Sequence, residues 1–337
     1  MFNFDQDRYV RIQTGAMNQA EGLHEAIGRA LADGADNLIF LGSGGAGILM
    51  QPAVQLLQRR SRFAVSLELP AEIVAAGSVR LGPTSLVVIP SLSGTTKESI
   101  AALRYSKEQN ARVITLVGHA ATPLGQEADE AFANFAEDDT SCESFYLQSL
   151  LLALSLMHHR GEFDDYDGAV AELRRLPQLL VEAKRAFEPR AEAFAETIRH
   201  EGYHIVTGAG NVWPEAFYYG MCILEEMQWI RTRPVHASDF FHGTLELLEK
   251  GVSVILFKGE DECRPLAERV EQFAPRYTDR FHVFDTAECE LPGISPAVRG
   301  LISPAILSAL FERVSAHLEH KRDHPLTTRR YYKQVAY

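Results

Sequence analysis

Apolar residues in the first half of this chain form short, nearly unbroken runs. The runs lie at 37–41, 63–67, 85–89, 113–117 and 131–135. Between them, and in a leading segment over 15–33, apolar residues recur every three or four positions, which predicts helices. Strands that are apolar on both faces and alternate with helices are typical of a parallel sheet covered on both sides. The pattern therefore predicts a three-layer α/β/α fold.

The same alternation returns in the second half. A long apolar helix is expected over 142–159, and a polar segment at 160–167 reads as a linker. A helical pattern over 168–200 follows, broken near Pro177 and Pro189. The strands and helices expected after it lie at 203–207, 214–228, 252–257, 263–274, 281–284 and 302–318.

The two halves keep a steady offset. Gly44 and Gly210, each in a turn after a strand, are 166 positions apart, and Gly94 and Gly259 are 165 positions apart. Two strand–turn–helix units with the same spacing indicate a duplicated α/β unit. We therefore expect an N-terminal domain over 1–160 and a C-terminal domain over 161–337.

Composition excludes several classes of protein. The net charge of −12 over 337 residues argues against a nucleic-acid surface, which needs a basic face. The four cysteines form no C-x-x-C pair, so we expect no zinc or dithiol site, and reduced thiols in a cytoplasmic protein. The start of the chain lacks a signal-peptide pattern, and the longest apolar run, 147–157, is too short to cross a membrane.

The turn after the first predicted strand is rich in glycine. Gly42, Gly44 and Gly45 precede a helix, where backbone N–H groups can approach an anion. The spacing is not that of the dinucleotide fingerprint. Glu68, after the second predicted strand, is followed at once by Leu69 and Pro70, so we do not expect it to serve as the acidic residue of that fingerprint. The alternative is a tight turn that needs a positive φ.

The turn after the third predicted strand is rich in hydroxyls. Ser91, Ser93, Thr95 and Thr96 surround Gly94 between a buried strand and a helix. The carboxyl edge of a parallel sheet is where open α/β folds bind ligands, and these hydroxyls favour a phosphate group. The alternative is N-capping of the following helix by Ser93 or Thr96, but capping needs one hydroxyl and not four.

The candidate acid/base residues lie in the second half. Glu225 and Glu226 interrupt an otherwise apolar segment over 221–229, so at least one carboxylate is expected to face a buried environment. A buried carboxylate has a raised pKa and can move protons, whereas the alternative is a solvated helix face. Sixteen residues after Glu226, His242 follows two phenylalanines, and it is either catalytic or simply packed. His236 is open to the same two readings.

Several segments together resemble the sugar-isomerase (SIS) family. They are LGSGGAG at 41–47, SLSGTTKES at 91–99, TSCESF at 140–145, ILEEMQW at 223–229, HASDFFHG at 236–243 and HPLTTRRYYKQVAY at 324–337. The resemblance spans the whole chain and is strongest to the bacterial fructosamine-6-phosphate deglycases, relatives of the isomerase half of glucosamine-6-phosphate synthase. It implies two tandem SIS subdomains with flavodoxin-like sheets.

The resemblance also implies roles for particular residues. Glu226 would move a proton between C1 and C2 of the sugar, and His242 would help to open the ring in the site of the neighbouring subunit of a homodimer. The residues expected to contact the phosphate or the rest of the substrate are Gly44, Gly45, Ser91, Ser93, Thr96, Ser141, Glu143, His236 and Lys333.

Two positions depart from the family pattern. Ala46 stands where the glycine loop often has a serine, so one phosphate donor is lost. Glu143 stands where the synthase branch has a lysine. Its carboxylate would meet the amino or amino-acid part of the substrate, or would simply lie on the surface.

The activity that the resemblance implies is hydrolysis of a 6-phosphofructosyl-amino acid to glucose 6-phosphate and an amino acid, with no metal or nucleotide cofactor. The alternatives are an aldose–ketose or aminosugar phosphate isomerase, and a non-enzymatic sugar-phosphate sensor. A sensor that regulates transcription would need a basic DNA-binding arm, yet the first predicted strand already begins at Asn37. The sequence does not specify which amino acid leaves, or whether the sugar is fructosyl or glucosyl.

Overall fold

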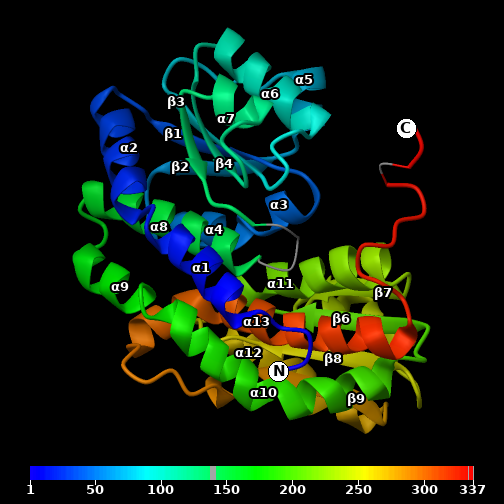
Figure 1. Ribbon diagram of the computed structural model, residues 1–337. Coiled ribbons are helices and arrows are strands. Elements are labelled where there is room, and N and C mark those ends of the chain that lie inside the picture. The colour runs from blue at the N-terminus through cyan, green and yellow to red at the C-terminus, as the bar shows by residue number, and fades with distance from the viewer. Residues whose placement is uncertain (137–141, 333, 337) are drawn as a thin grey trace. The chain divides into compact units, whose positions relative to one another are not determined.

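The computed structural model describes residues 1–136, 142–332 and 334–336, and it divides into two compact units (Figure 1). The N-terminal unit is Gln6–Pro177, and the C-terminal unit is Gln178–Tyr337 together with Met1–Asp5. The division falls after Pro177, whereas the sequence pattern placed it at 160/161. Helix α9 (Tyr166–Leu173) stays with the N-terminal unit, where the Tyr166 hydroxyl donates to the Ala20 carbonyl over 3.2 Å.

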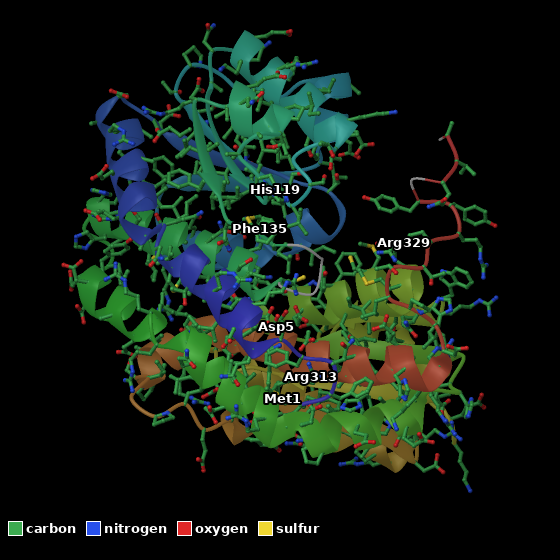
Figure 2. The ribbon with its side chains drawn as sticks, viewed as in Figure 1. Met1, Asp5, His119, Phe135, Arg313 and Arg329 are labelled. Atoms are coloured by element: carbon green, nitrogen blue, oxygen red, sulfur yellow. The ribbon has the colours of Figure 1, made fainter. Side chains whose placement is uncertain are left out.

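The first five residues pack on the C-terminal unit. The backbone N–H of Phe2 donates to Glu188 Oε1 over 2.7 Å, and its carbonyl accepts from the buried Arg313. The Arg313 guanidinium also lies 5.0 Å from the centre of the Phe4 ring. Met1, Asp5 and Arg313 are labelled near one another in Figure 2.

The N-terminal unit is built on a five-stranded parallel sheet with the order β2-β1-β3-β4-β5. This is the flavodoxin-like order that the resemblance implied. The strands are β1 (Asn37–Leu41), β2 (Ala64–Glu68), β3 (Ser85–Ser91), β4 (Arg112–Val117) and β5 (Glu130–Ala133). Every residue of β3 is buried, as expected of a central strand covered on both faces.

Helices cover both faces of this sheet (Figure 1). The sequence predicted one leading helix over 15–33, and the structure has two. The helices are α1 (Gln6–Met17), α2 (Ala20–Ala32), α3 (Gly44–Ile48), α4 (Gln51–Arg60), α5 (Pro70–Ala76), α6 (Lys97–Glu108), α7 (Pro123–Glu127) and α8 (Glu143–His159). Helix α8 is buried from Glu143 to Met157, which explains why it is apolar on all sides.

The C-terminal unit is built on a four-stranded parallel sheet with the order β7-β6-β8-β9. This order repeats β2-β1-β3-β4, so the predicted duplication is confirmed at the level of topology. The strands are β6 (Tyr203–Gly208), β7 (Arg231–His236), β8 (Ser253–Lys258) and β9 (Arg280–Asp285). The longer helices are α10 (Leu176–Ile198), α11 (Trp213–Tyr218), α12 (Arg264–Phe273) and α13 (Pro296–Arg322).

Strand β7 was not predicted from the sequence. Its residues, RTRPVH, alternate charged and small side chains and contain Pro234. An edge strand tolerates this composition, because only one of its sides pairs with the sheet and proline has no N–H to donate. Its identity as a strand depends on pairing with β6.

Each sheet has a point at which the chain changes direction. After β1 the chain moves to β2 on one side, and after β3 it moves to β4 on the other; β6 and β8 are related in the same way. Loops that leave two such neighbouring strands diverge and leave space for a ligand at the carboxyl edge. Among the residues that the structure describes, no helix is long and apolar enough to cross a membrane.

Candidate active site

The glycine loop and the hydroxyl loop follow neighbouring strands of the N-terminal sheet. Strands β1 and β3 run in register, with Leu38 beside Leu86 and Phe40 beside Val88. The glycine loop (Gly42–Gly47) leaves the end of β1, and the hydroxyl loop (Ser91–Thr96) leaves the end of β3. Both loops therefore lie at the direction change of this sheet, which is the ligand-binding position of open α/β folds.

Glycine is needed at three positions of the glycine loop, for different structural reasons. Gly42 and Gly47 pack backbone to backbone, because a Cβ atom on Gly42 would lie 2.7 Å from Gly47 Cα. Gly44 has φ +56°, so the positive-φ turn proposed as an alternative is real. The space over Gly44 is also open, since a Cβ atom there would meet nothing within 4 Å. Gly45 and Ala46 follow in the first turn of α3, half-buried.

The hydroxyl loop is held in place by its own backbone. Gly94 has φ +61°, and a Cβ atom on it would lie 2.1 Å from the Thr122 hydroxyl oxygen. Its N–H donates to Ser91 Oγ over 3.2 Å, and its carbonyl accepts from Leu124 N–H over 3.2 Å. Glycine is thus required at 94 both for the turn and for the close approach to Thr122.

The hydroxyls are not used as helix caps. Thr96 is the N-cap residue of α6, yet its side chain makes no capping hydrogen bond. Its hydroxyl oxygen instead lies 3.4 Å from that of Ser91, while Ser93 Oγ accepts from Thr95 N–H over 3.4 Å. Ser91 is buried and Thr96 exposed, so the pair runs from the sheet edge toward solvent. The capping interpretation is therefore wrong for Thr96.

Glu143 is an internal residue and not a surface one. Its side chain is fully buried at the start of α8, and the Tyr9 hydroxyl of α1 donates to its Oε1 over 3.1 Å. The surface alternative for Glu143 is thus wrong, because the carboxylate forms part of the packing between these helices. Ser141, expected nearby in the chain, lies outside the described residues.

The segment with the two adjacent glutamates is a π-helix. The sequence predicted one α-helix over 214–228. The structure has a short 3₁₀ turn, η1 (Gly210–Val212), then α11, and then the π-helix η2 (Tyr219–Met227). π-helices are rare and are frequent at functional sites. This one buries Cys222, Ile223 and Leu224 and carries Glu225 and Glu226 in its last turn.

The structure gives the two glutamates different surroundings. Glu225 is exposed, and its Oε1 accepts from the backbone N–H of Thr232 over 3.2 Å and from its hydroxyl over 2.7 Å, which ties η2 to β7. Glu226 Oε1 lies 2.9 Å from Arg329 Nε. The Glu226 side chain is 36% exposed. Glu225 therefore lies at the surface, whereas Glu226 is half-buried and faces a guanidinium that is only 13% exposed.

Arg329 comes from the C-terminal tail, which folds back onto the end of the π-helix (Figure 2). Helix α13 ends at Arg322, and Asp323 takes a left-handed conformation with φ +49°. The Gln228 side-chain amide then donates to the His324 carbonyl over 2.8 Å. One residue past Arg329, the Arg330 guanidinium lies 3.9 Å from the centre of the Trp229 ring.

His242 ends the 3₁₀-helix η3 (Asp239–His242) and is exposed, so the packed alternative is wrong for it. His236, the last residue of β7, is half-buried. Its Nδ1 accepts from Ser238 N–H over 3.2 Å, so neutral His236 carries its proton on Nε2. Lys333, the other tail candidate, lies outside the described residues.

The turn after β6 in the C-terminal sheet differs from the glycine loop after β1 in the N-terminal sheet. Gly210 has φ +61°, close to the +56° of Gly44, but a Cβ atom on it would lie 2.2 Å from Asp261 Oδ2. The same oxygen accepts from Asn211 N–H over 2.8 Å, and Asp261 Oδ1 accepts from Cys263 N–H over 3.0 Å. A carboxylate of the chain itself therefore fills the position that is open over Gly44.

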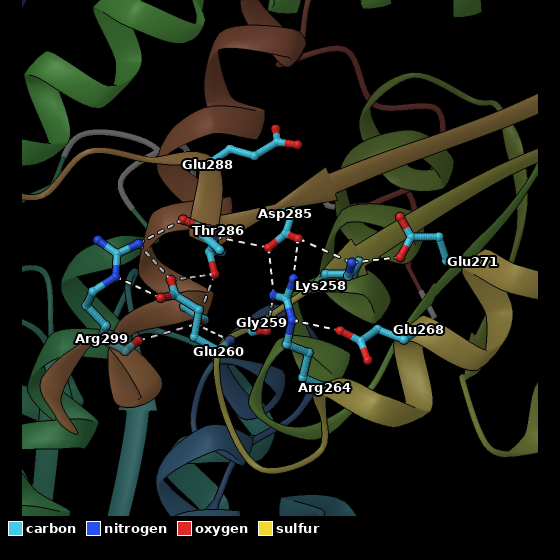
Figure 3. A network of polar contacts seen from close by, with 12 residues as sticks. Lys258, Gly259, Glu260, Arg264, Glu268, Glu271, Asp285, Thr286, Glu288 and Arg299 are labelled. Carbon is cyan, nitrogen blue, oxygen red and sulfur yellow. Dashed lines mark hydrogen bonds and ion pairs between the residues drawn. The ribbon is translucent and has the colours of Figure 1, made fainter. Parts of the chain in front are cut away.

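The residues after β8 are also committed to internal ion pairs (Figure 3). Glu260 accepts from Arg299 Nε and Nη2 over 2.7 and 2.8 Å, and from the Thr286 hydroxyl over 2.9 Å. Arg264 forms a two-point ion pair with Asp285. Burial opposes ionisation of Asp285, but the hydrogen bonds from Arg264 and the N–H of Ala287 outweigh it and lower its pKa. The network favours a structural role for this end of the sheet.

Three features were not predicted from the sequence: the π-helix, the ion pair of Arg329 with Glu226, and the closure of the second turn by Asp261. A signal for Arg329 is present in the sequence, because the tail segment over 324–337 is one of those that carry the family resemblance, although the resemblance points to Lys333. No group of three or more His, Cys, Asp or Glu side chains suited to a metal ion occurs within residues 1–136, 142–332 and 334–336.

In this duplicated α/β fold, a glycine loop and a hydroxyl loop share the ligand-binding edge of the N-terminal sheet. Residues 33–158 of the chain match the family model of the SIS domain. The fructosamine deglycase FrlB of Bacillus subtilis (strain 168) is 29% identical over 307 residues, which cover 90% of this chain and 93% of that protein.

Two further proteins give the same picture. The fructoselysine 6-phosphate deglycase of Escherichia coli (strain K12) is 24% identical, over 92% of this chain and 89% of that one. A crystal structure from Bacillus subtilis, described as a phosphosugar isomerase, superposes with a TM-score of 0.88 at 27% identity and covers 96% of this chain and 99% of that one. The similarity thus includes both sheets and is not limited to the N-terminal unit.

Proposed function

We propose that this protein is a deglycase that hydrolyses a 6-phosphofructosyl-amino acid to glucose 6-phosphate and a free amino acid. The observation that carries the proposal is Glu226, presented on a π-helix and paired with Arg329, in a chain similar along nine-tenths of its length to a fructosamine deglycase. The hydroxyl loop supplies donors of the kind that bind a sugar phosphate.

In the proposed reaction the phosphate is bound by Gly44, Gly45, Ser91, Ser93 and Thr96. Binding at the phosphate fixes the sugar and converts proton transfer into an intramolecular step. The first chemical step opens the sugar ring, which requires a proton to leave the C2 hydroxyl and another to reach the ring oxygen. We assign this step to His242, whose exposed position suits a group that reaches another subunit's substrate.

Glu226 then acts on the open-chain form. Its carboxylate removes a proton from C1, which gives an enaminol with a C1–C2 double bond, and it returns the proton to C2. The product is an imine between C1 and the amino-acid nitrogen. Water adds to C1, the C1–nitrogen bond breaks, and glucose 6-phosphate and the amino acid are released. A carboxylate can carry out both transfers because it is a base before the first and an acid before the second.

The Glu226→Gln variant tests the proposal. The amide is nearly isosteric but cannot accept the C1 proton, so glucose 6-phosphate release should fall by at least about a thousandfold while substrate binding persists. Release is followed with 6-phosphofructosyl-lysine, -asparagine and -glutamine, which also identifies the preferred amino acid. The assay uses glucose-6-phosphate dehydrogenase, and binding is measured by calorimetry.

The matched control is Glu225→Gln, because Glu225 stands next in the chain and its carboxylate contacts Thr232. This variant should keep most of the turnover. Near-normal turnover by Glu226→Gln would remove Glu226 as the proton shuttle. Conversion of fructose 6-phosphate without cleavage of any sugar-amine would favour an aldose–ketose isomerase, and binding without turnover would favour a sensor.

A further inference from the structure

Arg329 is placed to control the carboxylate proposed as the proton shuttle. Its Nε lies 2.9 Å from Glu226 Oε1, and its side chain is 13% exposed against 36% for Glu226. The two residues are 103 positions apart in the sequence, so the tail must fold back for the pair to form. Ion pairs between two fully exposed side chains add little, but one partner here is largely buried.

The guanidinium is oriented by the tail's own backbone. Nη1 of Arg329 donates to the carbonyl of Leu326 over 2.6 Å and to that of Thr328 over 3.0 Å. A guanidinium is planar, so fixing one terminal nitrogen also fixes the direction of Nε. These bonds hold the guanidinium beside Glu226, with Nε 2.9 Å from Oε1.

The tail is in turn anchored on both sides of Arg329. Leu326 N–H donates to Glu319 Oε1 of α13 over 3.0 Å, and the Gln228 amide holds the His324 carbonyl. On the other side of Arg329, Arg330 stacks on the ring of Trp229. Trp229 lies two residues after Met227, the last residue of the π-helix. The segment that delivers Arg329 is thus attached to the same helix end that carries Glu226.

We infer that Arg329 is the positioning residue of Glu226: through their ion pair it holds the carboxylate in place at the end of the π-helix before the C1 proton is removed. The inference rests on the proposed function. A proton shuttle must be charged when the substrate arrives, and a nearby guanidinium favours the charged form. It must also point at C1, and displacement of a catalytic group by about 1 Å can cost about a hundredfold in rate.

The test compares Arg329→Gln and Arg329→Lys with the wild-type protein, using the glucose 6-phosphate assay across pH. Arg329→Gln should lower kcat by at least about tenfold, with KM within about twofold. The acidic limb of its kcat/KM profile should move to higher pH, because the carboxylate loses its cationic partner. Arg329→Lys should keep the acidic limb and recover part of kcat, since an ammonium supplies charge without the planar orientation.

The matched control is Arg190→Gln. Arg190 also pairs with a glutamate in the same unit, with Nη1 2.6 Å from Glu288 Oε2, but it belongs to α10. Its removal should leave kcat, KM and the pH profile unchanged. If Arg329→Gln folds poorly by circular dichroism, Arg329→Ala assayed with low-millimolar guanidinium replaces it, and added guanidinium should raise kcat.

Three outcomes overturn the inference: an unchanged kcat and pH profile in Arg329→Gln, a rise in KM alone, or no guanidinium rescue in the alanine variant. A rise in KM alone would make Arg329 a substrate-binding residue. These results differ from failure of the proposed function, in which Glu226→Gln itself would retain turnover and Arg329 would have no shuttle to position.

Discussion

At the scale of single residues, environment separates side chains that the sequence presents as equivalent. Glu225 and Glu226 are neighbours in an apolar segment, yet one joins the π-helix to β7 and the other meets Arg329. Ser91 and Thr96 are likewise two of several hydroxyls, but their oxygens lie 3.4 Å apart at the sheet edge. Residue type therefore limits what a position can do, and its contacts decide what it does.

The phosphate assignment is tested by Ser91→Ala. Loss of one buried donor should raise KM for the sugar phosphate about tenfold and leave kcat within about twofold, because the phosphate binds equally before and during proton transfer. Steady-state kinetics on a 6-phosphofructosyl-amino acid measures both constants.

The control for this prediction is Ser78→Ala, since Ser78 accepts from Arg80 N–H in the same unit but outside the hydroxyl loop. An unchanged KM for Ser91→Ala, together with an unchanged KM for the corresponding Thr96 variant, would contradict phosphate binding by this loop.

At the scale of elements, the two halves share a topology and differ in the turns at their sheet edges. Gly44 and Gly210 have nearly the same φ, but the space over Gly44 is open and Asp261 fills the space over Gly210. Asp261 accepts hydrogen bonds from two backbone N–H groups, as a bound anion does at the start of a helix. The turn after β6 is thus closed by the chain's own carboxylate, whereas the turn after β1 is open.

Removal of this carboxylate should affect stability and not catalysis. Asp261→Ala leaves the N–H groups of Asn211 and Cys263 without their acceptor, which should lower the free energy of unfolding by about 1–3 kcal/mol. Thermal or urea unfolding measures the loss, and the glucose 6-phosphate assay should give wild-type kcat and KM.

Asp261→Asn retains an acceptor oxygen and should lose less stability than the alanine variant. A large loss of turnover in a folded Asp261→Ala protein would contradict the structural role and would assign the second turn to the reaction.

At the scale of the whole molecule, we propose that the activity involves a second copy of the chain. His242 is exposed at the end of η3, and we propose that it serves the site of the neighbouring subunit in a homodimer. A subunit with an inactive Glu226 would then still supply a working His242 to its partner.

Mixing tests this arrangement. Glu226→Gln and His242→Asn subunits, each inactive alone, should recover about a quarter of wild-type turnover after unfolding and refolding together. Half of the dimers are then mixed, and each mixed dimer has one intact site. Light scattering checks the dimer, and refolding each variant alone is the control. No recovery from a mixture shown to form dimers would place both residues in one subunit's site.

The sequence by itself determined the α/β class and most strands, because buried parallel strands leave unbroken apolar runs. It also determined the duplication, because the glycine turns at Gly44 and Gly210 can each be recognised from their neighbouring residues and then compared. It also identified the glycine and hydroxyl loops and the two glutamates, since each lies within a few residues of a strand or an apolar helix. Strand β7 escaped, because an edge strand with Pro234 is defined by its neighbour and not by its own pattern.

Only the tertiary structure decided which of these residues meet. Glu226 pairs with Arg329, which lies 103 positions further along the chain. Asp261 closes the turn at Gly210, which lies 51 positions before it. The π-helix buries Cys222, Ile223 and Leu224. An α-helix over the same residues would fit the same pattern of apolar positions, so the sequence does not distinguish the two kinds of helix. Contacts between distant segments arise from the folded chain as a whole, so no local pattern records them.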